Sequence, residues 1–67
     1  MSVARVTEIS STSTKSFEDA IQQGIARATK TLRGVSGAWI KEQKIAVKND
    51  KITSYQVNMM VSFVLDD

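Results

Sequence analysis

The 67-residue sequence contains no cysteine, no histidine and no proline, and it has only three glycines and one tryptophan. Without cysteine no disulfide forms, and without cysteine or histidine a zinc site of the usual kind is excluded. The commonest general base and the strongest nucleophile of enzymes are missing too, and the neighbouring carboxylates of Asp66 and Asp67 stand at a chain end. We therefore predict that the protein is not an enzyme, and we assign no metal-ligating residues.

Charge and hydropathy exclude two further classes of protein. The formal net charge of +2 is too small for a nucleic-acid-binding surface. The sequence has no apolar run long enough to span a bilayer. Residues Met1–Ile9 alternate polar and apolar side chains instead of forming a signal peptide. Together with the absence of cysteine, this predicts a cytoplasmic protein with neither a nucleic-acid nor a membrane partner.

The chain length predicts a single domain over residues 1–67 that needs stabilisation beyond its own hydrophobic core. A chain of this size buries only about 60% of its unfolded surface and is marginally stable alone. Because disulfides and a zinc site are excluded, self-association is the remaining common means of stabilisation. We therefore expect the protein to be an oligomer.

The segment Ile52–Leu65 predicts an unusually long β-strand. Its odd positions are almost all apolar, whereas Ser54, Gln56 and Asn58 make the even positions polar in the middle. This period of two is typical of a strand with one face on a core. Fourteen residues extend over roughly 45 Å, far more than the usual strand of about five or six residues.

The rest of the chain predicts an α+β fold in the order β-α-β-β. The expected elements are a strand at Val3–Ile9, a Ser/Thr loop at Ser10–Thr14, a helix at Phe17–Arg33, a strand at Val35–Val47 and a turn at Lys48–Lys51. Ser16 is a suitable N-cap, and Gly34 supplies a left-handed residue that stops the helix. A change in apolar parity predicts a bulge near Lys44. We expect a three-stranded antiparallel sheet with the helix on one face.

A helix of about 25 Å cannot cover a ribbon of roughly 45 Å. Trp39 and Gln56 are predicted on the face that the helix leaves uncovered. An indole stacks on flat heteroaromatic rings, and a carboxamide both donates to and accepts from a polar ring edge. The alternative is that Trp39 fills a subunit interface and Gln56 bonds across it. Lys41, Lys44 and two further lysines make the hairpin basic, either as a solvated edge or as a subsite for a phosphate-bearing ligand.

Three segments resemble a known family in order and spacing: RVTEISSTSTKSFEDAI, ARATKTLRGV and SYQVNMMVSFVL. Over nearly its whole length the chain resembles the dodecins, small flavin-binding proteins. The resemblance implies a sheet wrapped around the helix and a hollow homododecamer. It also implies flavin (FMN, riboflavin or FAD) held in pairs between subunits related by two-fold axes, as storage or protection. Bacterial relatives are further associated with coenzyme A near the three-fold contacts.

The resemblance assigns three candidate flavin-binding residues. Gln56 stands where the family's glutamine bonds the pyrimidine edge of the isoalloxazine. Gly37 occupies the position of the family's stacking tryptophan, and Trp39 follows two residues later, about 7 Å along the strand on the same face. We expect a flavin-storage protein in which Trp39 takes over the stacking. The alternative is a flavin-free shell in which Trp39 is an assembly contact and the interior holds an ion or coenzyme A.

Overall fold

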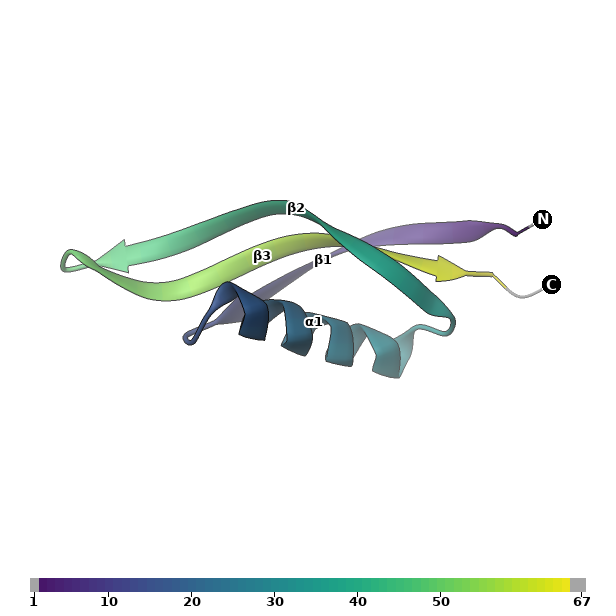
Figure 1. Cartoon of the computed structure of the whole chain (residues 1–67), viewed down its shortest axis with the longest axis horizontal. Helices are drawn as coiled ribbons and strands as arrows, with labels where there is room; N and C mark the ends of the chain where they lie inside the picture. The colour runs from purple at the N-terminus through teal and green to yellow at the C-terminus, as the bar shows by residue number, and fades with distance from the viewer. Residues whose placement is uncertain (1, 66–67) are drawn as a thin grey trace.

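The structure, a computed structural model, describes residues 2–65, so Asp66 and Asp67 lie outside the described residues. Its elements are β1 (Ala4–Ser13), α1 (Phe17–Thr31), β2 (Val35–Lys48) and β3 (Lys51–Val64). The strands form one antiparallel sheet in which β3 lies between β1 and β2 (Figure 1). The predicted fold class is confirmed, with the long third strand at the centre of the sheet.

β1 is longer than predicted because most of the Ser/Thr cluster belongs to it. Ser10 and Ser13 pair with Asn58 and Tyr55 of β3. Serine and threonine side chains compete locally with regular structure, but pairing with a central strand provides this backbone with a continuous hydrogen-bond ladder. The chain leaves the sheet only after Ser13, whose Oγ accepts a hydrogen bond from the Lys15 N–H at 2.9 Å. The loop predicted for residues 10–14 is therefore wrong for residues 10–13.

α1 begins as predicted and ends two residues earlier. Ser16 Oγ accepts a hydrogen bond from the Asp19 N–H at 3.0 Å, which caps the first turn. Leu32 is already extended, with φ −110° and ψ 139°, so the helix stops at Thr31. Gly34 adopts the predicted left-handed conformation (φ 73°) in the turn into β2. Within residues 2–65 there is no helix of the length and apolar character needed to cross a membrane.

The hairpin that joins β2 and β3 has the predicted turn but a displaced bulge. Asn49 and Asp50 have φ of 53° and 65°, and two successive left-handed residues match the twist of antiparallel strands. The bulge that changes the parity lies at Lys41, where the pairing register skips a residue, and not near Lys44; further register shifts lie between Val35 and Gly37 and between Ala46 and Val47. One extra residue reverses the side-chain alternation along the rest of the strand. As a result Gln43, which regular alternation from Trp39 would place on the uncovered face, lies opposite a buried valine of the core.

The hydrophobic core lies between α1 and the middle of β3. Its buried residues are Ala20, Val57 and Met59, with Ile9, Phe17, Ile21 and Ile25 packed against them. Gly24 also lies on the buried stripe of α1, and a Cβ there would come within 2.6 Å of Met59 Cε. The absence of a side chain at Gly24 therefore lets this part of the helix pack closely on the sheet.

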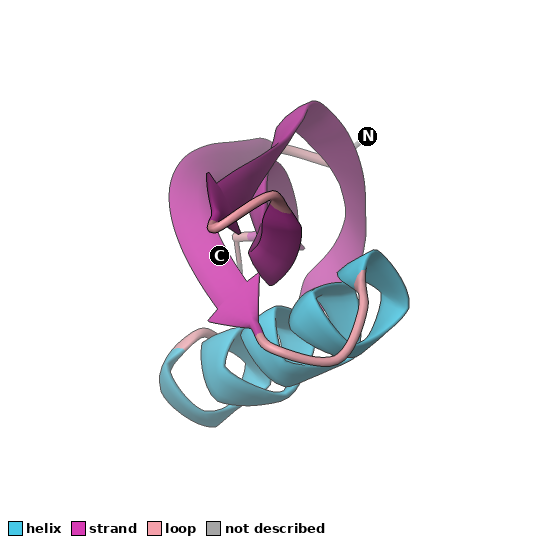
Figure 2. Ribbon diagram, turned by 90° about the vertical axis from the view of Figure 1, so that its left-hand side faces the viewer, coloured by secondary structure: helices cyan, strands magenta, loops and turns pink. Residues whose placement is uncertain are grey.

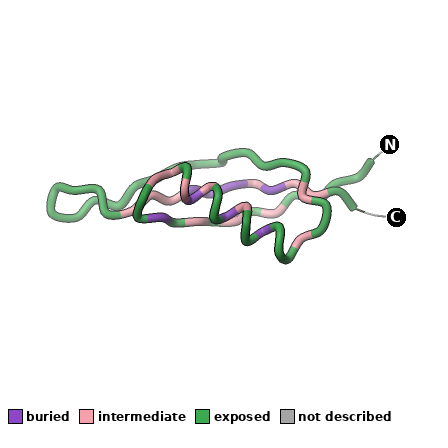
Figure 3. Tube along the Cα trace, turned by 60° about the horizontal axis from the view of Figure 1, so that its bottom comes forward, coloured by how far each residue is buried: buried purple, intermediate pink, exposed green. Residues whose placement is uncertain are grey.

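The helix is too short to cover the sheet, as predicted. α1 has 15 residues, which is about 22 Å, whereas the longest dimension of the subunit is 52 Å. Figure 1 shows the hairpin end of β2 and β3 extending past α1, and Figure 2 shows the sheet curving over the helix. In Figure 3 the buried residues cluster along α1 and β3, and the hairpin end is exposed. One end of the sheet, together with the face that points away from α1, is therefore open.

Candidate functional site

One face of the sheet points away from α1, and we call it the helix-free face. Alternation along the strands, together with the pairing register, places side chains from all three strands on it. Its central residues are Glu8, Ser10 and Thr12 of β1, Gln56, Asn58, Met60 and Ser62 of β3, and Gly37, Trp39, Lys41, Glu42 and Lys44 of β2. This face therefore gathers the three residues predicted to bind a ligand.

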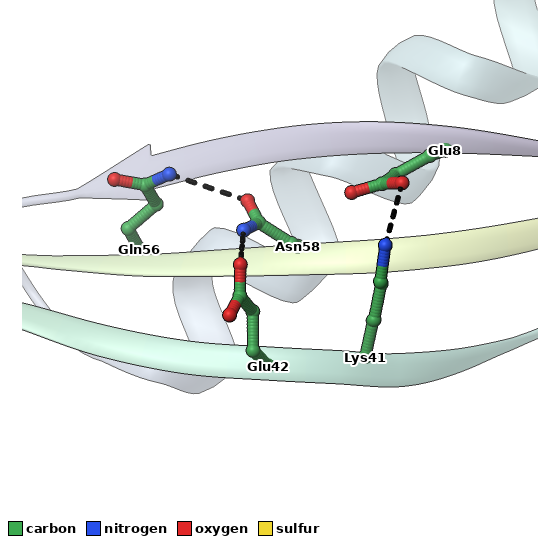
Figure 4. Close-up of polar contacts among 5 residues, drawn as sticks. All are labelled: Glu8, Lys41, Glu42, Gln56 and Asn58. Carbon is green, nitrogen blue, oxygen red and sulfur yellow. Dashed lines mark hydrogen bonds and ion pairs between the residues drawn. The ribbon is translucent and has the colours of Figure 1, made fainter.

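A chain of hydrogen bonds crosses the middle of the helix-free face (Figure 4). Gln56 Nε2 donates to Ser10 Oγ at 2.9 Å and to Asn58 Oδ1 at 3.2 Å. Asn58 Nδ2 in turn donates to Glu42 Oε1 on β2. Because Asn58 is only 8% exposed, its polar atoms depend on partners within the protein. The network ties the three strands together through their side chains.

An ion pair lies beside this network. Lys41 follows core-facing Ile40 and lies on the helix-free face, where its Nζ reaches across β3 to within 3.1 Å of Glu8 Oε1 (Figure 4). Both side chains are about half exposed, so water and salt screen their attraction. Such a pair contributes little to folding stability, and the surface it covers is accessible to a ligand.

Trp39 and Gln56 share the helix-free face, as expected, but do not touch within one chain. Trp39 lies opposite Met60 and is 53% exposed, so its indole offers an open apolar surface. Met60 and Gln56 are four residues apart on β3, which corresponds to about 13 Å. A ligand that contacts both side chains must therefore span this distance or take the two residues from different subunits.

Gly37 lies farther from Gln56, opposite Ser62. Ser62 Oγ donates a hydrogen bond to the Gly37 carbonyl oxygen at 3.1 Å. A Cβ on Gly37 would meet only this Oγ, at 3.6 Å, which is an ordinary van der Waals contact. The backbone here thus has room for a larger side chain, and glycine leaves this part of the helix-free face without a stacking surface of its own.

Two open grooves flank α1 on the other side of the sheet. The larger, about 610 Å³, lies between α1 and β1 and is partly polar, with Gln23 and Arg27 among its lining residues. The smaller, about 440 Å³, lies between α1 and β2 and is lined mainly by apolar residues such as Ile25 and Val35. Both grooves lie beside the edge strands of the sheet, β1 and β2.

The sequence interpretation missed Asn58 and Glu42 as members of the site. The sequence does contain an indication for Asn58. A polar side chain in the middle of a central strand is largely buried, and it therefore needs a hydrogen-bond partner within the protein. Glu42 gave no such signal. With the bulge placed near Lys44, strand alternation assigned Glu42 to the helix side, and only the observed register brings it beside Asn58.

Comparison with known families identifies the fold. A family model described as Dodecin matches residues 3–66. The chain belongs to the dodecin family. Dodecins form oligomers and bind small ligands, and they are in general binding or storage proteins that carry out no catalysis. No curated protein matches the sequence.

Solved dodecin structures match the whole subunit. A Thermus thermophilus dodecin mutant is 34% identical over 100% of both chains, with a TM-score of 0.93. The dodecin of Streptomyces davaonensis is 35% identical over 98% of this chain and 97% of that one, with a TM-score of 0.92. The calcium dodecin of Mycobacterium tuberculosis, described as a calcium-chelating antigen, is 32% identical over 96% and 91%, with a TM-score of 0.81. Among residues 2–65 of the present dodecin, no three His, Cys, Asp or Glu residues gather as for a metal ion.

Proposed function

We propose that this dodecin is a non-catalytic flavin-binding and storage protein that works as a hollow homododecamer. The observation that carries the proposal is the half-exposed indole of Trp39 on the same helix-free face as the carboxamide of Gln56. Trp39 supplies the surface on which the isoalloxazine stacks, and Gln56 supplies a partner for its pyrimidine edge. Gly37, at the family's stacking position, leaves space for the ring to shift toward Trp39.

The separation of Trp39 and Gln56 supports a site built between subunits. Within one chain the two positions are about 13 Å apart along β3. At any one place, therefore, a single subunit provides either the stacking surface or the partner for the ring edge, but not both. A second copy facing the first across a two-fold axis brings both kinds of group to a ring held between them. Oligomerisation and flavin binding are therefore parts of one proposal.

The uncovered hairpin end supports assembly independently of the ligand. It exposes three β-branched aliphatic side chains, Ile45, Val47 and Ile52. Val47 is 62% exposed although it lies in a strand, and such an apolar cluster on a small soluble domain marks a contact surface. We propose that neighbouring copies cover this hairpin end in the shell.

Flavin binding is tested by titrating riboflavin with the purified protein and following the loss of flavin fluorescence. Trp39→Ala should weaken binding about 5- to 150-fold, because stacking on one aromatic side chain is worth about 1–3 kcal/mol. Val6→Ala, which shortens another exposed apolar side chain on the same face, is the matched control and should bind normally. Saturable binding that is unaffected by Trp39→Ala, with the oligomer intact, would exclude Trp39 as the stacking residue.

Assembly is tested by size-exclusion chromatography with light scattering. The wild-type chain should elute as a dodecamer, and Val47→Lys or Ile52→Lys should lower the mass by placing a charge in an apolar contact. Gln22→Lys, which adds the same charge at an exposed polar position of α1, should leave the mass unchanged. A wild-type mass of one subunit would refute the shell.

A flavin-free shell is the second candidate, and Gly37 is the observation that favours it. The residue at the family's stacking position has no side chain, so stacking on the flavin ring would depend on Trp39 alone. In this case Trp39 is an assembly contact and the interior holds an ion or coenzyme A. Isothermal titration with calcium and with coenzyme A, beside riboflavin, separates the two candidates. Heat from calcium or coenzyme A alone, together with loss of the dodecamer in Trp39→Ala, would establish the second.

A further inference from the structure

The Gln56 side chain has no hydrogen-bond donor left for a ligand. A carboxamide nitrogen carries two hydrogens, and Gln56 Nε2 donates to Ser10 Oγ at 2.9 Å and to Asn58 Oδ1 at 3.2 Å. Both donors are therefore used within the subunit. The group that Gln56 can offer to a ligand is its oxygen, Oε1, which only accepts.

Glu42 determines this orientation of the Gln56 amide. The Ser10 hydroxyl does not, because it can donate as well as accept. An ionised carboxylate only accepts, so the Asn58 amide must present its nitrogen to Glu42 and its oxygen to the opposite side. That oxygen then requires a donor, which turns the Gln56 nitrogen toward Asn58 and the Gln56 oxygen away from it. Figure 4 shows the three side chains in this order, with Gln56 Oε1 directed away from Asn58.

The burial of the three residues suits this role. Asn58 is 8% exposed, so water has little access to its amide. If the amide were rotated, its oxygen would face the Glu42 carboxylate, and two hydrogen-bond acceptors would meet without a donor between them. Gln56 is only partly buried and Glu42 is exposed. The rigid member of the chain is thus in the middle, and the member that meets the ligand is at the accessible end.

We propose that Glu42 and Asn58 are positioning residues that make Gln56 a pure hydrogen-bond acceptor, so that the ligand of the helix-free face must present an N–H donor at the edge that meets Gln56. The isoalloxazine imide N–H is such a donor. This inference rests on the proposed function and adds a chemical selection to it: rings whose edge carries only acceptors are rejected, because their lone pairs would face Gln56 Oε1.

The test compares riboflavin with 3-methylriboflavin, in which a methyl group replaces the imide hydrogen. Wild-type protein should bind riboflavin at least about fivefold more tightly, the expected effect of losing one hydrogen bond. In Asn58→Leu, which leaves a Gln56 hydrogen free and its amide able to rotate, this preference should fall toward one. Glu42→Gln, whose carboxamide can donate or accept, should reduce the preference while disturbing the fold less.

Lys41→Gln is the matched control, because it removes the neighbouring ion pair with Glu8 and leaves the Gln56 network in place. It should keep the wild-type preference for riboflavin. Equal binding of the two flavins by wild-type protein would overturn the inference but not the proposed function. A preference that persists unchanged in both Asn58→Leu and Glu42→Gln would show that the methyl group acts by its bulk, and it would also overturn the inference.

A second readout does not depend on flavin. In the crystal structure of the unliganded protein at about 1 Å resolution, where amide nitrogen and oxygen are distinguished, Gln56 Nε2 should lie against Asn58. Gln56 Oε1 in that place would overturn the positioning role. If neither flavin binds, the proposed function fails, and the ligand selection with it, while this structure still decides whether Glu42 and Asn58 orient Gln56.

Discussion

Replacement of Gly34 by alanine should destabilise the subunit by an amount that the structure allows us to estimate. Gly34 has φ 73°, and an L-residue with a Cβ pays about 1–2 kcal/mol in the left-handed region. The new Cβ would also lie 2.9 Å from the carbonyl oxygen of Val64. This oxygen belongs to the backbone, so it cannot swing aside as the end of a side chain would.

The same contact affects a hydrogen bond. The Val64 N–H donates to the Gly34 carbonyl oxygen at 2.9 Å, so relieving the clash by separating the two backbones weakens a bond worth about 0.5–1.5 kcal/mol. Alanine also lowers the conformational entropy of the unfolded chain, which offsets the loss of stability by about 0.4–1 kcal/mol. The net expectation for Gly34→Ala is a loss of about 0.5–3 kcal/mol.

Gly37→Ala is the matched control for this estimate. Gly37 is not among the residues with positive φ, and a Cβ there makes only an ordinary contact of 3.6 Å. We expect its stability to stay within about 0.5 kcal/mol of wild type.

Thermal unfolding at a fixed subunit concentration, which controls for coupling to assembly, provides the measurement. Gly34→Ala should lower Tm by roughly 2–24 °C, and Gly37→Ala should not lower it measurably. Equal Tm values for the two variants would refute the reasoning from backbone conformation.

Three further predictions concern the site and the core. Gly37→Trp should raise riboflavin affinity at least about fivefold, because the position has room for a side chain that stacks on the ring; unchanged fluorescence titrations with an intact oligomer would contradict this. Lys44→Gln, opposite Gln56 in the register, should weaken FMN about two- to fivefold without affecting riboflavin, and 0.5 M salt should abolish the difference. Met59→Ala, which empties a site that is 1% exposed, should cost about 2–5 kcal/mol in urea unfolding, whereas Met60→Ala on the helix-free face should cost less than half as much.

The sequence predicted the parts of the fold that depend on a residue's own backbone or on its near neighbours in the chain. The alternation around Val57 gave the central strand, Ser16 gave the start of the helix, and Asn49 with Asp50 gave the turn. Each of these residues acts through its own backbone or its immediate neighbours. The same is true of Gly34, whose left-handed conformation follows from the absence of a Cβ.

The parts that local signals did not predict depend on pairing with a distant strand. Ser10 belongs to β1 because its backbone bonds to β3, 48 residues later at Asn58, and a serine-rich segment carries no sign of that partner. The position of the bulge is likewise decided by the register and not by the residue at Lys41. Trp39 precedes the bulge, so simple alternation placed it on the correct face together with Gln56. Glu42 follows the bulge, so alternation gave no indication that it lies beside Asn58.

The bulge at Lys41 makes the register of β2 matter more than its composition. Exchanging one polar side chain for another there changes a surface contact. Pairing the same residues in regular alternation, without the bulge, would instead turn the distal half of the strand over, so that Glu42 would point at the core and Ile45 at the helix-free face. Homologous exchanges and loop grafts in this region should therefore preserve the bulge before they preserve residue type.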